Sequence, residues 1–273
     1  MAKVILITGC SSGFGNITAR LLASKNFLVY AGVRKPADLK ILEGVANLKP
    51  LLLDITWSQQ KINLTIEEII KKEGKIDVVI NNAGFGFIGP VGDSTEAEIK
   101  DQFETNFFGQ FRIIKSVLPS MREKNNGLII NINTISGLIS TAFYGSYSAS
   151  KFALDALTTS LRFEESVYNI DFVSVYPGSF RTKFWENIKW AKGSPDTNRK
   201  VGIIVNKVKW HRGDANRVVK LLAKIIETKN PKKNYMVGFN AYLQYYFFKL
   251  VPYEFIDWFG KKTVQRISRW TIR

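Results

Sequence analysis

Cysteine and histidine are almost missing from this sequence, which holds one of each among 273 residues. A lone cysteine, Cys10, cannot build an internal disulfide framework. Cys10 and His211 together are too few to supply the usual ligands of a structural zinc site. We therefore expect a reduced cytoplasmic protein that holds no metal.

Long apolar segments are missing as well. No stretch approaches the roughly 18 uninterrupted apolar residues that a membrane-spanning helix needs. The chain runs from Met1 through Lys3 directly into a short apolar segment, without the basic region and cleavage site of a secretory signal. Any membrane contact is thus predicted to be peripheral.

Acidic residues are scarce relative to basic ones, at 23 against 39, which gives a net charge of +16. This balance raises the question of nucleic-acid binding, because clustered Lys and Arg neutralise phosphates. The basic residues are spread along the chain, however, and no nucleic-acid-binding module is recognisable. We predict no nucleic-acid partner; an anionic cofactor or an anionic membrane surface accounts equally well for the sign of the charge.

What the sequence does contain is a regular alternation of short apolar runs and helical patterns. Unbroken runs rich in Val, Ile and Leu are typical of strands buried on both faces of a parallel sheet. The alternation predicts one α/β domain over residues 1–273, a doubly wound parallel sheet (Rossmann fold) with about seven strands and helices on both faces. The predicted strands cover residues 3–7, 27–33, 50–54, 76–80, 128–132, 171–176 and 235–238.

A glycine-rich turn, Thr8 to Gly15, separates the first predicted strand from a helix expected over 16–25. Glycines allow a tight turn and close backbone approach, and a helix N-terminus offers N–H groups and positive dipole to a pyrophosphate. The turn therefore predicts dinucleotide binding. Arg34, after the second strand, stands where an acidic residue would bind the ribose of NAD. A pair between Arg34 and the 2′-phosphate of NADP is therefore favoured. The alternative is that Arg34 belongs to an ordinary solvated loop.

Tyr147 and Lys151 lie four residues apart in the middle of the chain and would project from one face of a helix. An ammonium group one turn away favours the phenolate and lowers the pKa of a tyrosine toward neutrality. Such a pair also arises by chance on exposed helices, so its context decides the interpretation.

The context includes further polar positions at strand ends. Asp54 ends the third strand, placed to accept from an adenine amino group, and 81–84 (Asn-Asn-Ala-Gly) follows the fourth. A capping box at Thr95 to Glu98 predicts a helix through about Met121. It contains Asn106, which is either ordinary hydrogen-bonded structure or a helix kink that binds a water and feeds a proton chain.

Placed in order, these pieces resemble the short-chain dehydrogenase/reductase family over residues 3 to 182. The matching motifs are Thr8 to Gly15, Asn81 to Gly84, Asn106, Tyr147 with Lys151, and Pro177-Gly178 with Thr182. Within the family, the chain resembles the NADP-using branch that contains 17β-hydroxysteroid and retinol dehydrogenases. The residues that carry this resemblance are Cys10-Ser11-Ser12 in the glycine turn and Arg34 after the second strand.

The resemblance implies that Tyr147 is the general acid/base, that Lys151 lowers its pKa and holds the nicotinamide ribose, and that Asn106 anchors a water. It implies hydride transfer between a nicotinamide and a carbonyl carbon. The cofactor-binding residues would be Gly9, Ser11, Gly13 and Phe14 at the phosphates, Arg34, Asp54 and Asn82 on the adenosine side, and Tyr147, Lys151, Pro177, Gly178 and Thr182 toward the nicotinamide.

One position departs from the family. A serine usually stands thirteen residues before the tyrosine and orients the substrate carbonyl, but the residue here is Thr134. Threonine offers the same hydroxyl with an added methyl group. Thr134 is favoured for this role over Ser136, two residues later.

The family resemblance implies a substrate lid over about 181–213. Phe184, Trp185, Trp190 and Trp210 there suit a bulky apolar ligand or simply pack the lid on the body. The tail, about 239–273, combines aromatic residues with basic ones and predicts helices. These helices would lie on a membrane interface, cover the active site or form a dimer contact.

The sequence thus predicts an NADP-dependent oxidoreductase that acts on a small hydrophobic ketone or secondary alcohol, steroid-, retinoid- or acyl-like, with Tyr147 as the general acid/base. The alternative is a catalytically idle NADP-binding protein that senses redox state or docks on membranes. A homodimer or homotetramer is expected from the family resemblance.

Overall fold

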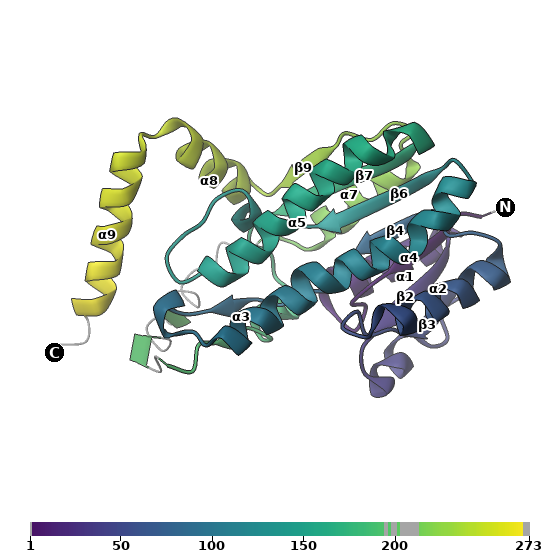
Figure 1. Cartoon of the computed structure of the whole chain (residues 1–273), viewed down its shortest axis with the longest axis horizontal. Coiled ribbons are helices and arrows are strands. Elements are labelled where there is room, and N and C mark those ends of the chain that lie inside the picture. The colour runs from purple at the N-terminus through teal and green to yellow at the C-terminus, as the bar shows by residue number, and fades with distance from the viewer. Residues whose placement is uncertain (1, 194–195, 198–200, 203–212, 270–273) are drawn as a thin grey trace.

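Seven parallel strands form one sheet at the centre of the molecule (Figure 1). The structure is a computed structural model and describes residues 2–193, 196–197, 201–202 and 213–269. The spatial order is β3-β2-β1-β4-β6-β7-β9. The strands are β1 (Val4–Ile7), β2 (Leu28–Val33), β3 (Leu48–Leu52), β4 (Val78–Asn81), β6 (Gly127–Ile132), β7 (Ile170–Pro177) and β9 (Asn234–Val237).

Helices cover both faces of this sheet, which confirms the doubly wound α/β fold. The helices α1 (Gly13–Ser24) and α7 (Asn216–Glu227) enclose one apolar core, and α2 (Gln59–Glu73), α4 (Gly109–Glu123) and α5 (Gly145–Glu164) enclose the other. Ile5 and Ile7 of β1 belong to the first core, whereas Val4 and Leu6 belong to the second. Successive strand side chains point to opposite faces, so a strand with helices on both sides must be apolar throughout.

The strand order reverses between β1 and β4. From β1 the chain moves outward to β2 and β3, then returns to β4 on the other side of β1 and continues away. Loops that leave neighbouring strands at such a point diverge and leave a crevice at their carboxyl ends. The glycine-rich turn after β1 and the polar segment after β4 therefore meet at this crevice.

Local signals set the helix ends as the sequence predicts. Gly74 ends α2 in the left-handed conformation, with φ +78°. Thr95 and Glu98 form the predicted capping box at the start of α3 (Glu96–Phe103). The helix continues through a π-helical segment, η3 (Glu104–Phe108), into α4. Asn106 therefore lies where the helix departs from α geometry, a feature of one of the two interpretations given for it from the sequence.

Some elements differ from the sequence-based expectation. The helix expected from residue 16 begins at Gly13, because the end of the glycine turn is already helical. A second, two-stranded sheet pairs β5 (Phe87–Ile88) with β8 (Lys189–Trp190). Two-residue strands carry no recognisable pattern, so this contact between distant segments could not be predicted. Short helical turns connect the rest: η1 (Pro36–Leu42), η2 (Val91–Asp93), η4 (Ile135–Gly137), η5 (Glu165–Tyr168) and η6 (Lys183–Trp185).

The C-terminal segment forms two helices, α8 (Phe239–Leu250) and α9 (Tyr253–Arg269), here called the arm. In Figure 1, α9 is the outermost element at the end of the molecule opposite the N-terminus. No helix in the described part of the chain is long and apolar enough to cross a membrane. Two of the residues predicted for the lid and its surroundings, Trp210 and His211, lie outside the described residues.

Candidate active site

A cavity of about 1660 Å³ opens at the carboxyl ends of the central strands and extends to the arm. It brings together nearly all of the residues predicted from the sequence. Those that line it are Gly9, Ser11, Gly13, Phe14, Arg34, Asp54, Asn82, Thr134, Ser136, Tyr147, Lys151, Pro177, Gly178 and Thr182. Asn106 is the one predicted site residue that does not line the cavity.

The glycine-rich turn is packed so closely that side chains would not fit. Gly9 has φ +71°, and a Cβ atom there would lie 2.8 Å from the Cα of Ala83. A Cβ on Gly15 would lie 2.5 Å from the Nδ2 of Asn82. That amide nitrogen donates to the carbonyl oxygens of Thr8 and Gly9, at 2.9 and 3.0 Å. Asn82 therefore holds the turn in shape.

The first turn of α1 faces the same cavity with the features of an anion site. Ser12, its N-cap residue, makes no side-chain capping bond, and no acidic residue stands in the first turn. The N–H groups and the positive end of the helix dipole are therefore left for a ligand. The Oγ atom of Ser179, which lines the cavity, is buried without a hydrogen-bond partner among the described residues. These residues fit a dinucleotide cofactor.

Two charged residues mark the far end of the cavity. Arg34 follows β2 directly, is exposed, and makes no ion pair within the described residues. Asp54 accepts hydrogen bonds from the backbone N–H and the hydroxyl of Thr56, at 2.9 and 2.8 Å. Its remaining acceptor capacity can face a ligand.

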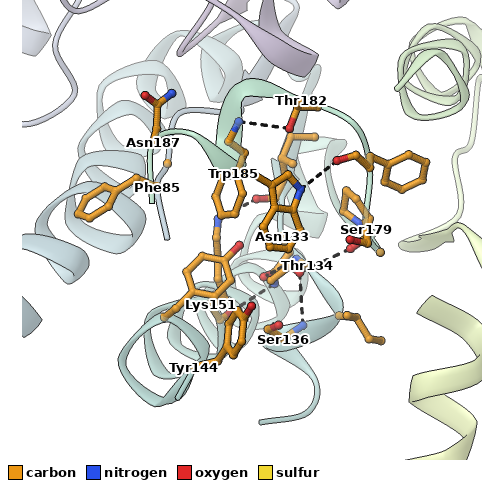
Figure 2. Close-up of a pocket in the computed structure, with 18 of the residues that line it drawn as sticks. Phe85, Asn133, Thr134, Ser136, Tyr144, Lys151, Ser179, Thr182, Trp185 and Asn187 are labelled. Atoms are coloured by element: carbon orange, nitrogen blue, oxygen red, sulfur yellow. Dashed lines mark hydrogen bonds between the residues drawn. The ribbon is translucent and has the colours of Figure 1, made fainter. Parts of the chain in front are cut away.

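Tyr147 is buried at the start of α5, with its side chain in the cavity. Burial raises the pKa of its phenol above the ordinary value, and the neighbouring Thr134 hydroxyl acts in the opposite direction. Thr134 accepts from the backbone N–H of Ser136 at 3.4 Å, and Figure 2 shows the two residues side by side. The Thr134 hydroxyl donates to the carbonyl oxygen of Pro177 at 3.5 Å. Of the two hydroxyls, that of Thr134 is the one that acts on the pKa of the phenol.

Lys151 does not lower the pKa of Tyr147 in this structure, contrary to the expectation from the sequence. Its Nζ atom donates to the backbone carbonyl of Ile132, at 2.9 Å, and its side chain is only 4% exposed. Desolvation lowers the pKa of Lys151 to about 7. The four-residue spacing correctly predicted that Tyr147 and Lys151 share one helix face. The direction of both pKa shifts depends on the burial of the two groups, which the spacing does not reveal.

Asn106 lies behind the cavity, fully buried in η3. Its amide accepts from the backbone N–H of Phe85 at 3.1 Å and donates to the carbonyl of Phe85 at 3.0 Å and to Ser150 at 3.3 Å. A Cβ atom on Gly84 would lie 3.0 Å from the Oδ1 of Asn106 and 3.8 Å from the Nζ of Lys151. The position that a Gly84 side chain would take thus lies between Asn106 and Lys151, tightly against the Asn106 amide.

A buried network that the sequence did not reveal joins β6, β7 and α5. Asn133 donates to the carbonyl of Lys151 and to Asp155, both at 3.3 Å, and its own oxygen accepts from the N–H of Thr134 at 3.0 Å. Asp155 also accepts from Ser174, at 3.1 Å, and from the phenol of Tyr176. The available signal was that Asp155 stands one turn after Lys151 on the same helix face.

Aromatic rings form the wall beside the phenol. The Phe184 ring lies 5.9 Å from that of Tyr147 and 5.8 Å from that of Trp185. Lys189 stands 4.4 Å from the centre of the Phe85 ring. The β5–β8 pairing fixes this part of the predicted lid to the body beside the cavity.

The fold and its glycine turn define a dinucleotide-binding protein of the Rossmann class. The family model described as short chain dehydrogenase matches residues 3–192. A 3-ketodihydrosphingosine reductase from Bacteroides thetaiotaomicron is 42% identical over 185 residues, which are 68% of this chain and 66% of that protein. Retinol dehydrogenase 8 of Homo sapiens is 35% identical over 190 residues, 67% of this chain and 60% of that protein.

A solved structure of a short-chain dehydrogenase from Streptomyces avermitilis has a TM-score of 0.81 to this chain at 27% identity, covering 99% of this chain and 98% of that one. The chain belongs to the short-chain dehydrogenase/reductase family. It is an oxidoreductase that uses a nicotinamide cofactor on CH–OH or C=O groups. The matched segments span about two thirds or less of the two relatives named above.

The low pKa of Lys151 makes stability depend on pH. Between about 7 in the folded state and the ordinary value of 10.5, the unfolded chain binds more protons than the folded one. Stability therefore rises with pH across this window, and Lys151→Met should remove a contribution of roughly 1 kcal/mol per pH unit between about pH 7.5 and 9.5. Urea unfolding at several pH values measures it.

Lys71→Met, on the exposed face of α2, is the control and should leave the pH slope unchanged. Parallel pH profiles for wild type and Lys151→Met would show that Lys151 keeps an ordinary pKa in the folded protein.

Proposed function

We propose that this protein is an NADPH-dependent reductase of a hydrophobic ketone, with Tyr147 as the general acid. The observation that carries the proposal is the meeting of Thr134, Tyr147 and Lys151 in the cavity that also receives the glycine turn. When bound, the cofactor supplies the hydride. The residues of the chain supply orientation and the proton.

The environment of Tyr147 suits donation of a proton. With its pKa raised by burial, Tyr147 is protonated at neutral pH. It can give its proton to a carbonyl oxygen because that oxygen becomes strongly basic as it gains negative charge. The Thr134 hydroxyl favours the phenolate left after transfer. Thr134 can also donate to the substrate oxygen, the role that the family gives to serine.

Lys151 and Asn106 are placed to return a proton to Tyr147. With a pKa of about 7, the lysine exchanges protons readily near neutral pH. The position beside Gly84 that a Cβ atom would take lies near two polar groups, the amide oxygen of Asn106 and the ammonium of Lys151. A water held there would link the lysine toward solvent.

NADP is the proposed cofactor because of Arg34. Its guanidinium lies at the cavity edge after β2 and is free of ion pairs among the described residues, so it can pair with a 2′-phosphate. Gly9, Ser11, Gly13 and Phe14 would hold the phosphates, Asp54 and Asn82 would lie on the adenosine side, and Pro177, Gly178 and Thr182 would lie toward the nicotinamide.

The proposed substrate is a ketone with a long apolar chain. The cavity lining carries a set of large apolar side chains, which are Leu138, Ile139, Phe184, Trp185, Phe247 and Phe248. The relative from Bacteroides thetaiotaomicron is named for the reduction of 3-ketodihydrosphingosine, a ketone of this kind. We propose a substrate of the same chemical class for this protein. We also propose that the chain is a single domain in which residues 181–213 form the substrate lid.

The idle-binder alternative rested on Thr134 in place of serine. The Thr134 hydroxyl lines the same cavity as Tyr147 and acts on the pKa of its phenol, which argues against that alternative. A homodimer or homotetramer stays a prediction, which light scattering of the purified protein would test.

Replacement of Tyr147 by Phe removes the proton donor and keeps the ring. We expect kcat for NADPH-dependent ketone reduction to fall by roughly 10²- to 10⁴-fold, with the Kd for NADPH nearly unchanged. Stopped-flow turnover and fluorescence titration measure the two quantities. Turnover that survives the change would refute the acid role, and tight NADPH binding by a wild-type protein without turnover would favour the idle binder.

Thr134 and Ser136 can be separated by substitution. Thr134→Val loses the hydroxyl at nearly constant volume, and kcat/KM should fall by roughly 10²-fold or more, as for other lost oxyanion donors. Thr134→Ser and Ser136→Ala should both stay within a few-fold of wild type. If Ser136→Ala were the damaging change, the roles of the two residues would be reversed.

Arg34→Ala should weaken NADPH binding by roughly 10- to 100-fold, because a hydrogen-bonded charge pair is lost. Binding of NADH, which has no 2′-phosphate, should not change. Isothermal titration with both cofactors measures this selectivity. Lys40→Ala, an exposed cation in η1 outside the cavity lining, is the matched control. Equal loss for NADPH and NADH would assign Arg34 to general cofactor binding.

A further inference from the structure

The arm exposes an apolar face where a surface helix is normally polar. Along α8, Phe239, Tyr242, Leu243, Tyr246 and Leu250 follow the spacing that places side chains on one side of a helix. All five are exposed, and Phe239 and Leu250 reach 80% and 75%. The other side of α8 carries Asn240, Gln244, Phe247 and Phe248, which line the cavity. We call the exposed set the α8 face.

The outer surface of α9 combines rings with a cation. The rings of Phe255 and Trp258 are 5.5 Å apart, both about half exposed, and the Nζ of Lys262 stands 4.2 Å from the centre of the Trp258 ring. None of the three lines the cavity, whereas Ile256 and Gly260 do. The arm therefore has an inner side toward the site and an outer side toward solvent.

The charge of the arm has one dominant sign. Residues 239–269 contain five Lys and Arg residues against two acidic ones, and α8 has no acidic residue. One of the acidic residues, Asp257, is already paired with Lys261, at 2.6 Å. Aromatic side chains that point outward beside cations are the pattern of helices that lie in an anionic membrane interface.

We propose that the arm docks on the surface of an anionic lipid bilayer through the α8 face together with Phe255, Trp258 and Lys262. A second copy of this chain fits less well. A two-fold contact through the same face would bring the like charges of both copies together.

Docking would also supply the substrate, a step that rests on the proposed reduction of a long-chain ketone. The inner side of the arm forms part of the cavity wall, so the docked cavity borders the bilayer. A substrate dissolved in lipid could then pass along Phe247 and Phe248 toward Tyr147 without crossing water. The bilayer contact itself does not depend on the chemistry of the site.

Sedimentation of the full chain with vesicles tests the docking. The protein should bind vesicles of phosphatidylcholine with phosphatidylglycerol at low salt, bind phosphatidylcholine vesicles more weakly, and be released as salt rises. Leu243→Ser with Leu250→Ser should lower the partition coefficient about tenfold or more, because two apolar side chains are lost from the contact. Lys249→Glu with Lys262→Glu should lower binding to the anionic vesicles alone.

Phe163→Ser with Val167→Ser is the matched control. These two side chains are equally exposed, at 71% and 74%, but belong to the far end of α5 and to η5. Partition that is unchanged in the Leu243/Leu250 variant, or equally reduced in the control, would overturn the proposal. The proposal would also be overturned if the wild-type protein were a dimer in solution and the Leu243/Leu250 variant were a monomer. That result would assign the α8 face to contact with a second copy.

Turnover separates the docking from the proposed chemistry. On a short water-soluble ketone the Leu243/Leu250 variant should keep the wild-type rate, since neither residue lines the cavity. On a long-chain ketone carried in anionic vesicles it should be slower. Tyr147→Phe should bind vesicles like wild type and turn over neither substrate. Vesicle binding without reduction of any ketone would leave the docking intact and refute the proposed reaction.

Discussion

The attachment of β6 to α5 is the constraint on which the site depends. Asn131 accepts from Asn81 at 2.9 Å and donates to Thr158 of α5 at 2.8 Å, both bonds fully buried. Two residues further on, the Asn133 amide donates to the backbone carbonyl of Lys151 and to the carboxylate of Asp155. Buried polar groups of this kind are costly when left unpaired, so each bond fixes the register of strand against helix. Thr134 and Tyr147 come from different elements and meet because that register is fixed.

The same burial that aligns these groups sets their chemistry. Lys151 and Tyr147 both lie in a poorly solvated place, and desolvation disfavours the charged form of each. A neutral phenol and a lysine poised near neutral pH are the forms that proton donation and reprotonation need. The folded protein bears a cost in stability for this arrangement, as active sites commonly do.

The molecule combines this rigid centre with an exposed arm. The sheet and its helices hold the glycine turn, Thr134 and Tyr147 in place, whereas α8 and α9 present large apolar side chains to solvent. Such surface is expected where another phase or molecule covers it. Residues of both parts line the cavity, with Thr134 and Tyr147 from the centre and Phe247 and Phe248 from the arm.

The sequence by itself determined the features that depend on neighbouring residues: the apolar strands, the glycine turn after β1, the capping box at Thr95 and the shared helix face of Tyr147 and Lys151. Their causes lie within a few residues, where backbone sterics and side-chain periodicity act. Only the tertiary structure decided which hydroxyl acts on the pKa of Tyr147, how Asp155 and Tyr176 are joined to Asn133, and which face of α8 is exposed. It also reversed the expected pKa direction for Tyr147, because desolvation depends on the whole fold around a group and not on its spacing in the chain.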